Sequence, residues 1–473
     1  MLFNSVIFLL FFVVFFFLYW FVVGRSMRAQ NVLILLASYL FYGWWDWRFV
    51  FLLMLSTLID YFFGLIIHQS TTQARKKLYL WLSIVNNLGI LAFFKYYNFF
   101  AGSFQEFMAG FGLETHPYVL NILLPVGISF YTFHGMSYVL DIYNGKVTPF
   151  RNFIDYAVFV CFFPLLVAGP IERANHLLPQ VAKPRVFRYE QGMEGLRLIV
   201  WGLFKKVVIA DNLAVVVNNI FSDYSHESGS TLVLGAIYFA FQIYGDFSGY
   251  TDIALGTAKL LGFELLTNFK FPYFSRDIAE FWRRWHISLS SWFRDYVYIP
   301  LGGSAGGRGQ ALRNIFVIFL LSGFWHGAKW TYILWGAYHA LLYVPLFMIN
   351  TNRKHTGEIV AADRWLPSGR EAWQILVTFV LVTIGWVFFR ADTVHDAFYY
   401  LQGMGHNLLS MPAYADSLLL VVLFVCLDWL SRRDERKPHA FIPAVPYVLV
   451  LTIVLLLFGK GSENNIEFIY FQF

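Results

Sequence analysis

The sequence predicts an all-α fold, a polytopic membrane bundle of about 11–13 transmembrane helices. Hydrophobic residues make up 58% of the 473 positions and charged residues only 14%, against roughly 25% charged residues in a soluble domain. Apolar runs long enough to cross about 30 Å of hydrocarbon recur along nearly the whole chain. Basic residues gather in the short loops between these runs, as cytoplasmic loops do. Topology thus explains the net charge of +6, and no nucleic-acid partner is predicted.

The N-terminal part predicts five spans with the N-terminus on the outer face. The first run, 6–23, lacks a preceding basic residue and a small-residue cleavage site, so it is a retained span. Basic residues at 25–28 and 75–77 mark inside loops, whereas 101–117 carries two glutamates, no Lys and no Arg, and lies outside. The predicted spans are 5–23, 31–45, 49–68, 79–100 and 118–140.

The apolar run 153–168 has basic residues on both sides, so both its ends are predicted to be cytoplasmic. A re-entrant segment that turns at Pro164 or at Gly169-Pro170 resolves this conflict. Irregular backbone is tolerated at membrane depth only where protein buries it or where it lines a wet cavity. The segment therefore predicts an internal cavity.

The remaining spans place the C-terminus on the outer face as well. Residues 245–249 interrupt one of them with glycines, Asp and Ser, which predicts a broken or kinked helix. The arginine-rich stretch 264–313 is a large inside segment, and the short run after it predicts a hairpin or partial span. These spans are 195–221, 231–263, 314–325, 331–349, 373–389, 416–430 and 444–459.

Three parts follow from this order of spans. N-terminal transmembrane helices occupy 1–117, and C-terminal transmembrane helices occupy 351–473. The core at 118–350 contains the re-entrant segment and a cytoplasmic amphipathic region.

The amphipathic region, 280–303, predicts a helix lying in the cytoplasmic membrane interface. On a helical period Trp282, Trp285 and His286 share one side, whereas Arg284 falls on the other. A plain amphipathic anchor would explain the pattern. His286 is the exception, because burial among tryptophans disfavours the imidazolium and leaves a neutral ring that can accept a proton.

Other polar groups occur inside apolar runs. His326 is bracketed by Gly323 and Gly327, which allow close approach by a substrate or a helix. An ionisable group at membrane depth is a functional candidate, although an interfacial histidine bonded to a carbonyl would also fit. Asp246 is a candidate helper in the interrupted span, and His134 lies in a span with several hydroxyl groups.

Motifs of several other chemistries are absent from the sequence. It contains no Walker-type loop, no HExxH pair, no CxxC and no GxSxG elbow. The glycine-rich patch 302–307 lacks the lysine of a phosphate loop. Cys161 and Cys426 lie far apart in separate apolar segments. No metal site and no permanently bound cofactor are predicted.

Five segments match the signature of a known family: Pro125–Tyr143, residues 168–173, Asp246–Asp252, Phe281–Ser290 and Gly323–Gly327. Together they resemble the membrane-bound O-acyltransferase superfamily, and in particular its bacterial branch of alginate O-acetyltransferase-like proteins. The resemblance covers residues 125 to about 340 and implies that His326 is the catalytic histidine. It also implies that His286 is the second signature histidine, in the cytoplasmic segment, and that His326 lies inside a central tunnel through the bundle.

The resemblance implies acyl transfer from a thioester to a hydroxyl group, which needs a base such as a neutral buried histidine. We therefore expect acetyl-CoA to be the donor, bound at the cytoplasmic face where arginines meet its phosphates. His326 would act as general base, and His286 would position a substrate group or tune the tunnel. The candidate substrate-binding residues are Trp282, Arg283, Trp285, Trp325, Asp246 and His134.

Relatives of this kind work in the bacterial inner membrane, so a multi-pass protein surrounded by membrane lipid is implied. An SGNH-type acetyltransferase or another polysaccharide-modifying partner in the periplasm would complete O-acetylation of an alginate-like exopolysaccharide. Peptidoglycan O-acetylation and teichoic acid D-alanylation are alternatives within the same chemistry. A scaffold for a secretion complex, or a transporter or flippase using Asp60, Asp141 and Asp246, is a non-enzyme alternative. The two histidines in tryptophan-rich surroundings, without an inverted repeat, favour the enzyme.

Overall fold

The chain forms two compact helical units. The first unit contains residues 1–188 and 261–266, and the second contains 189–260 and 267–473. Helices, turns and irregular segments make up the described residues, with no strand among them, which confirms the all-α prediction. The three-part division at 117 and 350 stays a prediction. The computed structural model describes residues 1–117, 119–120, 122–167, 169–458 and 468–469.

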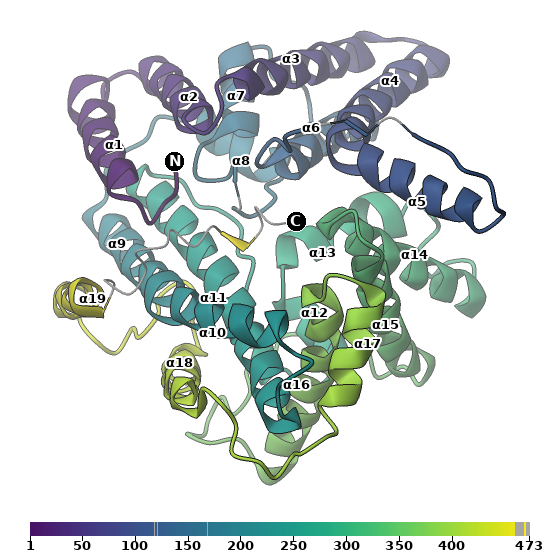
Figure 1. Ribbon diagram of the computed structural model, residues 1–473. Coiled ribbons are helices and arrows are strands. Elements are labelled where there is room, and N and C mark those ends of the chain that lie inside the picture. Colours follow the sequence, from purple (N-terminus) through teal and green to yellow (C-terminus); the bar gives the residue numbers. More distant parts are fainter. Residues whose placement is uncertain (118, 121, 168, 459–467, 470–473) are drawn as a thin grey trace. The chain divides into compact units, whose positions relative to one another are not determined.

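The first unit is built around three mutually packed helices, α3, α4 and α6 (Figure 1). Its elements, with π-helical turns labelled η, are α1 (Val6–Phe17), η1 (Leu18–Val22), α2 (Met27–Gly43), α3 (Arg48–Gln69), α4 (Gln73–Leu91), η2 (Ala92–Tyr96), α5 (Tyr97–Ala109), α6 (Ile128–Tyr143), α7 (Phe153–Cys161) and α8 (Ala174–Val181).

Asp60 forms a buried polar cluster where these three helices meet. Its carboxylate accepts hydrogen bonds from the Ser83 hydroxyl (2.6 Å) and from the Asn87 amide (2.9 Å), both on α4. Gly135 of α6 lies so close that an added Cβ would meet the carboxylate. Hydrogen bonds thus satisfy this buried carboxylate, which agrees with a structural role and not with a transport pathway.

Two predicted spans of this unit have different bounds. Helix continues from Gln73 to Ala109 through α4, η2 and α5, so 101–109 is helical where an outside loop was predicted. This stretch contains Gln, Glu, Met and Ala, which favour helix, and no proline. The span predicted at 118–140 begins its helix only at Ile128, because Gly127 takes a left-handed φ of 74° and Pro125 precedes it. Residues 118 and 121 lie outside the described part.

The predicted re-entrant segment contains a short helix followed by a turn. α7 has 9 residues and ends at Cys161, so at about 1.5 Å per residue it covers less than half of the hydrocarbon core. The Leu165 N–H donates to the Phe162 carbonyl (2.8 Å) across the turn that contains Pro164. Side chains from Asp155 of α7 through this turn are buried. The turn predicted at Pro164 is confirmed, and its depth in the membrane stays a prediction.

The second unit contains both candidate histidines. Its elements are α9 (Tyr189–Leu203), η3 (Phe204–Ala210), α10 (Asp211–Ser222), α11 (Gly229–Leu260), η4 (Pro272–Phe274), α12 (Ile278–Arg284), α13 (Ile287–Phe293), η5 (Arg294–Tyr298), α14 (Arg308–His326), α15 (Trp330–Met348), α16 (Gly369–Arg390), α17 (Val394–Gly403), η6 (Ala415–Ser417), α18 (Leu418–Ser431) and α19 (Ala444–Phe458). Here η3 and η5 are π-helical and η4 and η6 are 3₁₀ turns.

α11 is a continuous helix of 32 residues, so the break predicted at 245–249 is wrong. The glycines serve close packing instead. A Cβ at Gly249 would lie 2.7 Å from the Gly202 carbonyl oxygen, and one at Gly256 would lie 2.4 Å from the Gly195 carbonyl oxygen. Glycine at both positions therefore lets the backbones of α9 and α11 approach each other.

α14 and α15 form a tight antiparallel hairpin, which confirms the hairpin predicted for the short run after 313. Gly323 and Gly336 allow the approach, since an added Cβ would lie 2.2 Å from the Tyr332 carbonyl oxygen and 2.3 Å from the Phe319 carbonyl oxygen, respectively. His326 is the last residue of α14 and lies at the turn. The hairpin thus fixes the position of this histidine.

Three helical stretches of the described chain are long and apolar enough to cross a membrane: Arg48–Gln69, Gln73–Ala109 and Gly369–Arg390. Two further helical stretches, Val6–Val22 and Ala444–Leu456, are also apolar but shorter. They support the predicted membrane bundle. The predicted number of crossings and the central tunnel stay predictions.

Candidate active site

The segment around His286 is two short helices joined by a sharp bend, so the single helix predicted over 280–303 is wrong. α12 ends at Arg284, Trp285 is extended, and His286 has a left-handed backbone (φ 44°, ψ 53°). The bend is held from outside the segment, because the Ile287 N–H donates to the Asn268 carbonyl (3.0 Å) and the Lys270 N–H donates to the Arg284 carbonyl (3.0 Å).

The aromatic side of this segment faces protein, and the prediction that it faces the bilayer is wrong. Trp285 and Trp292 are buried. The Trp285 ring packs on Trp386 with ring centroids 4.9 Å apart and on Phe269 at 5.1 Å. Rings from α16 and from the segment before α12 thus cover the face that an interfacial anchor would leave to lipid.

His286 and His326 lie beside each other in this aromatic interior. Their ring centroids are 6.3 Å apart and their planes are inclined by 61°. His286 is 1% exposed and His326 5%. Trp335 and Phe389 each lie 5.3 Å from His326, centroid to centroid. Burial lowers the pKa of His286 to about 3, so its ring is neutral at pH 7.

Asp246 lies next to this pair through its neighbour in sequence, since the Phe247 ring packs 4.8 Å from the His286 ring. The Asp246 carboxylate is already engaged, by the Lys206 ammonium at 2.8 Å and by the Ile469 N–H at 2.7 Å. Phe468 packs on Tyr250 in the same region, with centroids 4.4 Å apart. Asp246 therefore anchors η3 and the described C-terminal residues beside the histidine.

Sequence reasoning missed the two buried lysines of η3. Lys206 pairs with Asp211 (2.8 Å) as well as with Asp246, and Lys205 pairs with Asp252 (2.7 Å). Adjacent lysines inside the predicted span 195–221 were a detectable signal, because charges at membrane depth are rare without partners.

A third buried histidine was also missed. His339 of α15 lies between Trp282 and Trp335, at 5.0 Å from each ring centroid. Neither of its ring nitrogens has a hydrogen-bond partner among the described residues. Because the Trp335 ring also packs edge-to-face on His326, it lies between His339 and the candidate pair. A histidine inside the predicted span 331–349 was the available signal.

The other predicted substrate-binding residues of this unit have two kinds of surroundings. Trp282 and Trp325 belong to the aromatic interior, and the Trp325 ring centroid lies 5.9 Å from that of His286. Arg283 donates to the Asn352 carbonyl (2.7 Å) and to the His355 carbonyl (3.1 Å). Its Nη2 group is buried and has no hydrogen-bond partner among the described residues, so the donors of this nitrogen are unused.

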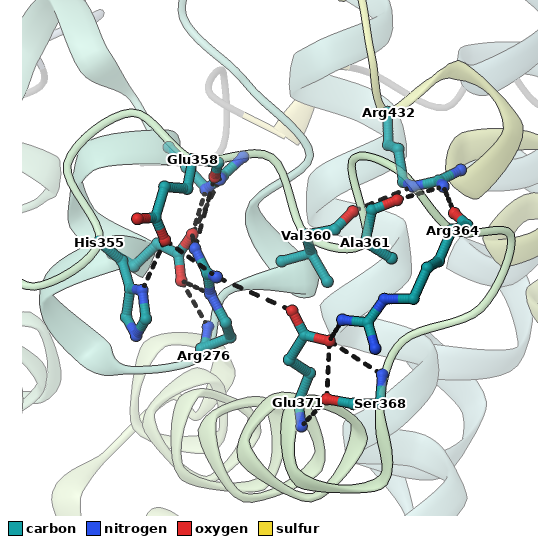
Figure 2. Close-up of polar contacts among 11 residues, drawn as sticks. Arg276, His355, Glu358, Val360, Ala361, Arg364, Ser368, Glu371 and Arg432 are labelled. Atoms are coloured by element: carbon teal, nitrogen blue, oxygen red, sulfur yellow. Dashed lines mark hydrogen bonds and ion pairs between the residues drawn. The ribbon is translucent and has the colours of Figure 1, made fainter.

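Arginines and glutamates fasten the loop 350–368 to the helices around the site (Figure 2). Arg276 contacts Glu358 (3.4 Å), and Arg364 pairs with Glu371 (2.9 Å) at the start of α16. Arg432 donates to the Val360 and Ala361 carbonyls at 3.2 and 3.0 Å. The loop therefore has a defined conformation beside Arg283.

The remaining predicted residue, His134, lies in the first unit. Its Nε2 accepts a hydrogen bond from the Glu172 N–H (3.0 Å), and the ring is buried. Glu172 belongs to the 168–173 motif, of which Ala168 lies outside the described residues. The contact shows a histidine that organises this motif, and its role in substrate binding stays a prediction.

Comparison with known proteins identifies the family. The model of the membrane-bound O-acyltransferase family matches residues 40–356, a range that includes both candidate histidines. The chain belongs to the membrane-bound O-acyltransferase family. It is therefore an O-acyltransferase, and the transporter and scaffold alternatives no longer apply.

Three relatives show which branches of the family are similar. The probable alginate O-acetylase AlgI of Pseudomonas putida is 41% identical, with all of both chains covered. The peptidoglycan O-acetyltransferase of Helicobacter pylori is 32% identical over all of this chain and 98% of its own. The teichoic acid D-alanyltransferase of Bacillus subtilis is 30% identical over 58% of this chain and 71% of its own. The similarity to the two O-acetylating relatives extends over the whole chain.

For an O-acyltransferase this arrangement offers an uncharged imidazole at His286 beside a second buried histidine, His326. A neutral imidazole can take the proton of a hydroxyl group, and the surrounding rings exclude the water that would hydrolyse an acyl donor. Histidines held on two different elements allow one ring to act as base while the other orients a reactant.

Proposed function

We propose that this enzyme transfers an acetyl group from acetyl-CoA, across the bacterial inner membrane, for O-acetylation of an extracytoplasmic polysaccharide. The observation that carries the proposal is the pair of buried rings, His286 and His326, held 6.3 Å apart in a member of the membrane-bound O-acyltransferase family.

His326 acts as the general base. It removes the proton of an attacking hydroxyl group as the oxygen bonds to the acetyl carbon. The carbon–sulfur bond of the thioester then breaks, and the proton passes from the imidazole to the leaving thiolate. His286 positions one of the reactants beside this ring, with its own neutral imidazole as the contact.

The donor enters from the side of the arginine-rich segment. The buried Nη2 group of Arg283, whose donors are unused among the described residues, is suited to a phosphate of CoA. Trp282, Trp285 and Trp325 provide the apolar wall along which the thioester arm reaches the histidines. Asp246 holds the adjacent Phe247, whose ring packs on His286. No cofactor needs to stay bound.

An alginate-like exopolysaccharide is the acceptor polymer that we propose, because the relatives that are 41% identical are named as probable alginate O-acetylases. Peptidoglycan is the second candidate, favoured by the full-length similarity to the Helicobacter pylori enzyme. Both termini lie on the periplasmic side in this proposal, and a periplasmic SGNH-type acetyltransferase completes transfer to the sugar.

The test is incubation of the purified enzyme with radiolabelled acetyl-CoA, with and without a candidate periplasmic partner. His326→Ala should abolish release of CoA and transfer of label, because the hydroxyl group loses its base. His395→Ala is the matched control, since that histidine is exposed, and it should retain wild-type rates. A folded His326→Ala protein with full activity would contradict the assignment of the base.

A further inference from the structure

A separate pocket of about 430 Å³ opens in the second unit, at the adjoining ends of α9 and α19. Its volume falls within the range of small-molecule sites. It shares no lining residue with the candidate active site. The pocket is lined by Tyr189, Glu190, Met193, Glu194, Arg197, Lys437, Ala440, Pro443, Ala444 and Val445.

Arg197 builds the floor of this pocket. Its guanidinium donates to the carbonyls of Pro438 (3.0 Å), His439 (2.9 Å) and Ile442 (2.7 Å), and it is buried. It also lies over the Tyr447 ring at 4.7 Å from the centroid. Since these partners are neutral, the positive charge of Arg197 is held in place without a carboxylate.

Glu194 supports one wall by bridging two lysines. Its carboxylate lies 2.7 Å from the Lys437 ammonium and 3.0 Å from the Lys259 ammonium. Lys437 keeps half of its side chain exposed, so it can donate to a ligand as well. Glu190 lies in the first turn of α9 with its side chain exposed at the pocket.

The lining thus combines two cations, Arg197 and Lys437, with two carboxylates, Glu190 and Glu194. A ligand with charge of only one sign would leave either the two cations or the two carboxylates without an opposite charge. Polyanions such as CoA, and anionic lipid headgroups, would place negative charge against Glu190. A zwitterion with an ammonium group and a phosphate group matches both signs.

An apolar surface leads away from the pocket along α19. That helix contains no charged residue, and its outward side chains include Val445, Leu449, Ile453 and Leu456, all exposed. Val445 belongs to both the pocket and this surface. The polar pocket therefore lies at the end of an apolar helix, where a lipid headgroup lies relative to its acyl chains.

We propose that this pocket binds the headgroup of a phospholipid that carries phosphoethanolamine. Lys437 and the Ala444 and Val445 N–H groups at the start of α19 contact the phosphate. The primary ammonium donates to the Glu190 carboxylate, and the acyl chains lie along the apolar surface of α19. The site is independent of acyl transfer, and it selects a primary ammonium over a quaternary one, which has no N–H to donate.

The test measures lipid retention by the purified full-length protein in detergent, using native mass spectrometry and thermal unfolding with defined lipids. Phosphatidylethanolamine should bind about tenfold more tightly than phosphatidylcholine or phosphatidylglycerol, the effect of a charge-assisted hydrogen bond. Glu190→Gln should remove this preference, whereas Glu106→Gln, the same change at an exposed residue of α5 that does not line the pocket, should keep it. Lys437→Gln should weaken retention, and Lys437→Arg should preserve it.

Equal retention of the three lipids would overturn the proposal. Stronger binding of phosphatidylglycerol or of CoA than of phosphatidylethanolamine would overturn it too. So would binding of soluble glycerophosphoethanolamine with the same affinity as the lipid. The unfolding temperature without added lipid checks that each variant is folded. Because retention is measured without any acyl donor, failure here is distinguishable from failure of the proposed acetyl transfer.

Discussion

At the scale of single residues, His286 combines a candidate catalytic ring with a strained backbone. A left-handed conformation costs a residue other than glycine about 1–2 kcal/mol, and His286 adopts it with φ 44°. Such strain persists where the surroundings over-determine it, which is common at functional sites. Here Asn268 and Lys270 hold the bend from the preceding segment.

Two substitutions of His286 distinguish the effect of its ring from the effect of its backbone. His286→Ala and His286→Gly should both lose most acetyl transfer, because both remove the imidazole. His286→Gly should be about 1 kcal/mol more stable than His286→Ala, since glycine tolerates positive φ. Acetyl-CoA turnover and thermal unfolding of the two variants measure the two effects. Equal stability of both proteins would show that the bend carries no strain.

Glu280 is a second residue whose contribution to stability depends on its surroundings. It is 1% exposed and lies between Arg276 (3.0 Å) and Arg284 (2.8 Å). Burial acts to raise the pKa of Glu280, but the hydrogen bonds and charges of the two arginines outweigh it and hold the pKa below its ordinary value of 4.5. The carboxylate therefore stabilises the fold above that value, and this contribution is lost as the pH falls through the lowered pKa.

Glu280→Gln should destabilise the protein by about 3 kcal/mol, because two arginines lose a buried partner. Glu358→Gln is the matched control. Its side chain is 66% exposed beside the same Arg276, so it should cost less than about 1 kcal/mol. Between pH 7 and pH 4, the unfolding temperatures of the Glu358→Gln control and of the unchanged protein should fall more steeply with decreasing pH than that of Glu280→Gln. Parallel curves would contradict the role of Glu280.

At the scale of elements, the close contact between α9 and α11 depends on glycines, which have no side chain. Gly249→Ala would place a Cβ 2.7 Å from the Gly202 carbonyl oxygen, so it should cost about 1–3 kcal/mol through forced separation of the helices. Gly89→Ala in α4 meets nothing within 4 Å and should stabilise by up to about 1 kcal/mol through helix propensity. Thermal unfolding in detergent compares them, and equal effects would contradict close packing.

The same element shows where prediction from sequence ends. Residues 245–249 were interpreted as a break because glycines weaken an isolated helix, whereas their role here depends on a partner helix distant in sequence. The bend at His286 was missed for a similar reason, since Asn268 imposes it. The turn at Pro164 and the α14–α15 hairpin were predicted correctly, because their signals are local: a proline, and a short apolar run.

Within the site, the apolar and glycine-rich surroundings of His286 and His326 marked them as candidates, the family resemblance gave their expected roles, and the structure added their proximity. Lys205, Lys206 and His339 were missed because each lies in an apolar run that was read as a plain span. Their partners come from other parts of the chain, among them Asp252 for Lys205 and Trp282 for His339. No pattern along the sequence shows such pairings.

At the scale of the whole molecule, the proposal requires directional transfer. In proteoliposomes, labelled acetyl-CoA supplied on the side of the basic loops should label an acceptor on the opposite side, because donor and acceptor enter from different compartments. Donor supplied on the other side should give no transfer. Labelling of an acceptor on the same side as the donor would contradict passage across the membrane.

The π-helical turn at Phe204–Ala210 has a consequence for how this chain can vary. Such a turn contains one surplus residue within an otherwise regular helix. Deleting that residue would rotate the two flanking halves against each other by about 100°. Lys205 and Lys206 would then lose their alignment with Asp252 and Asp246, leaving ammonium groups stranded in the interior. We therefore expect this chain not to tolerate deletion of a residue from Phe204–Ala210.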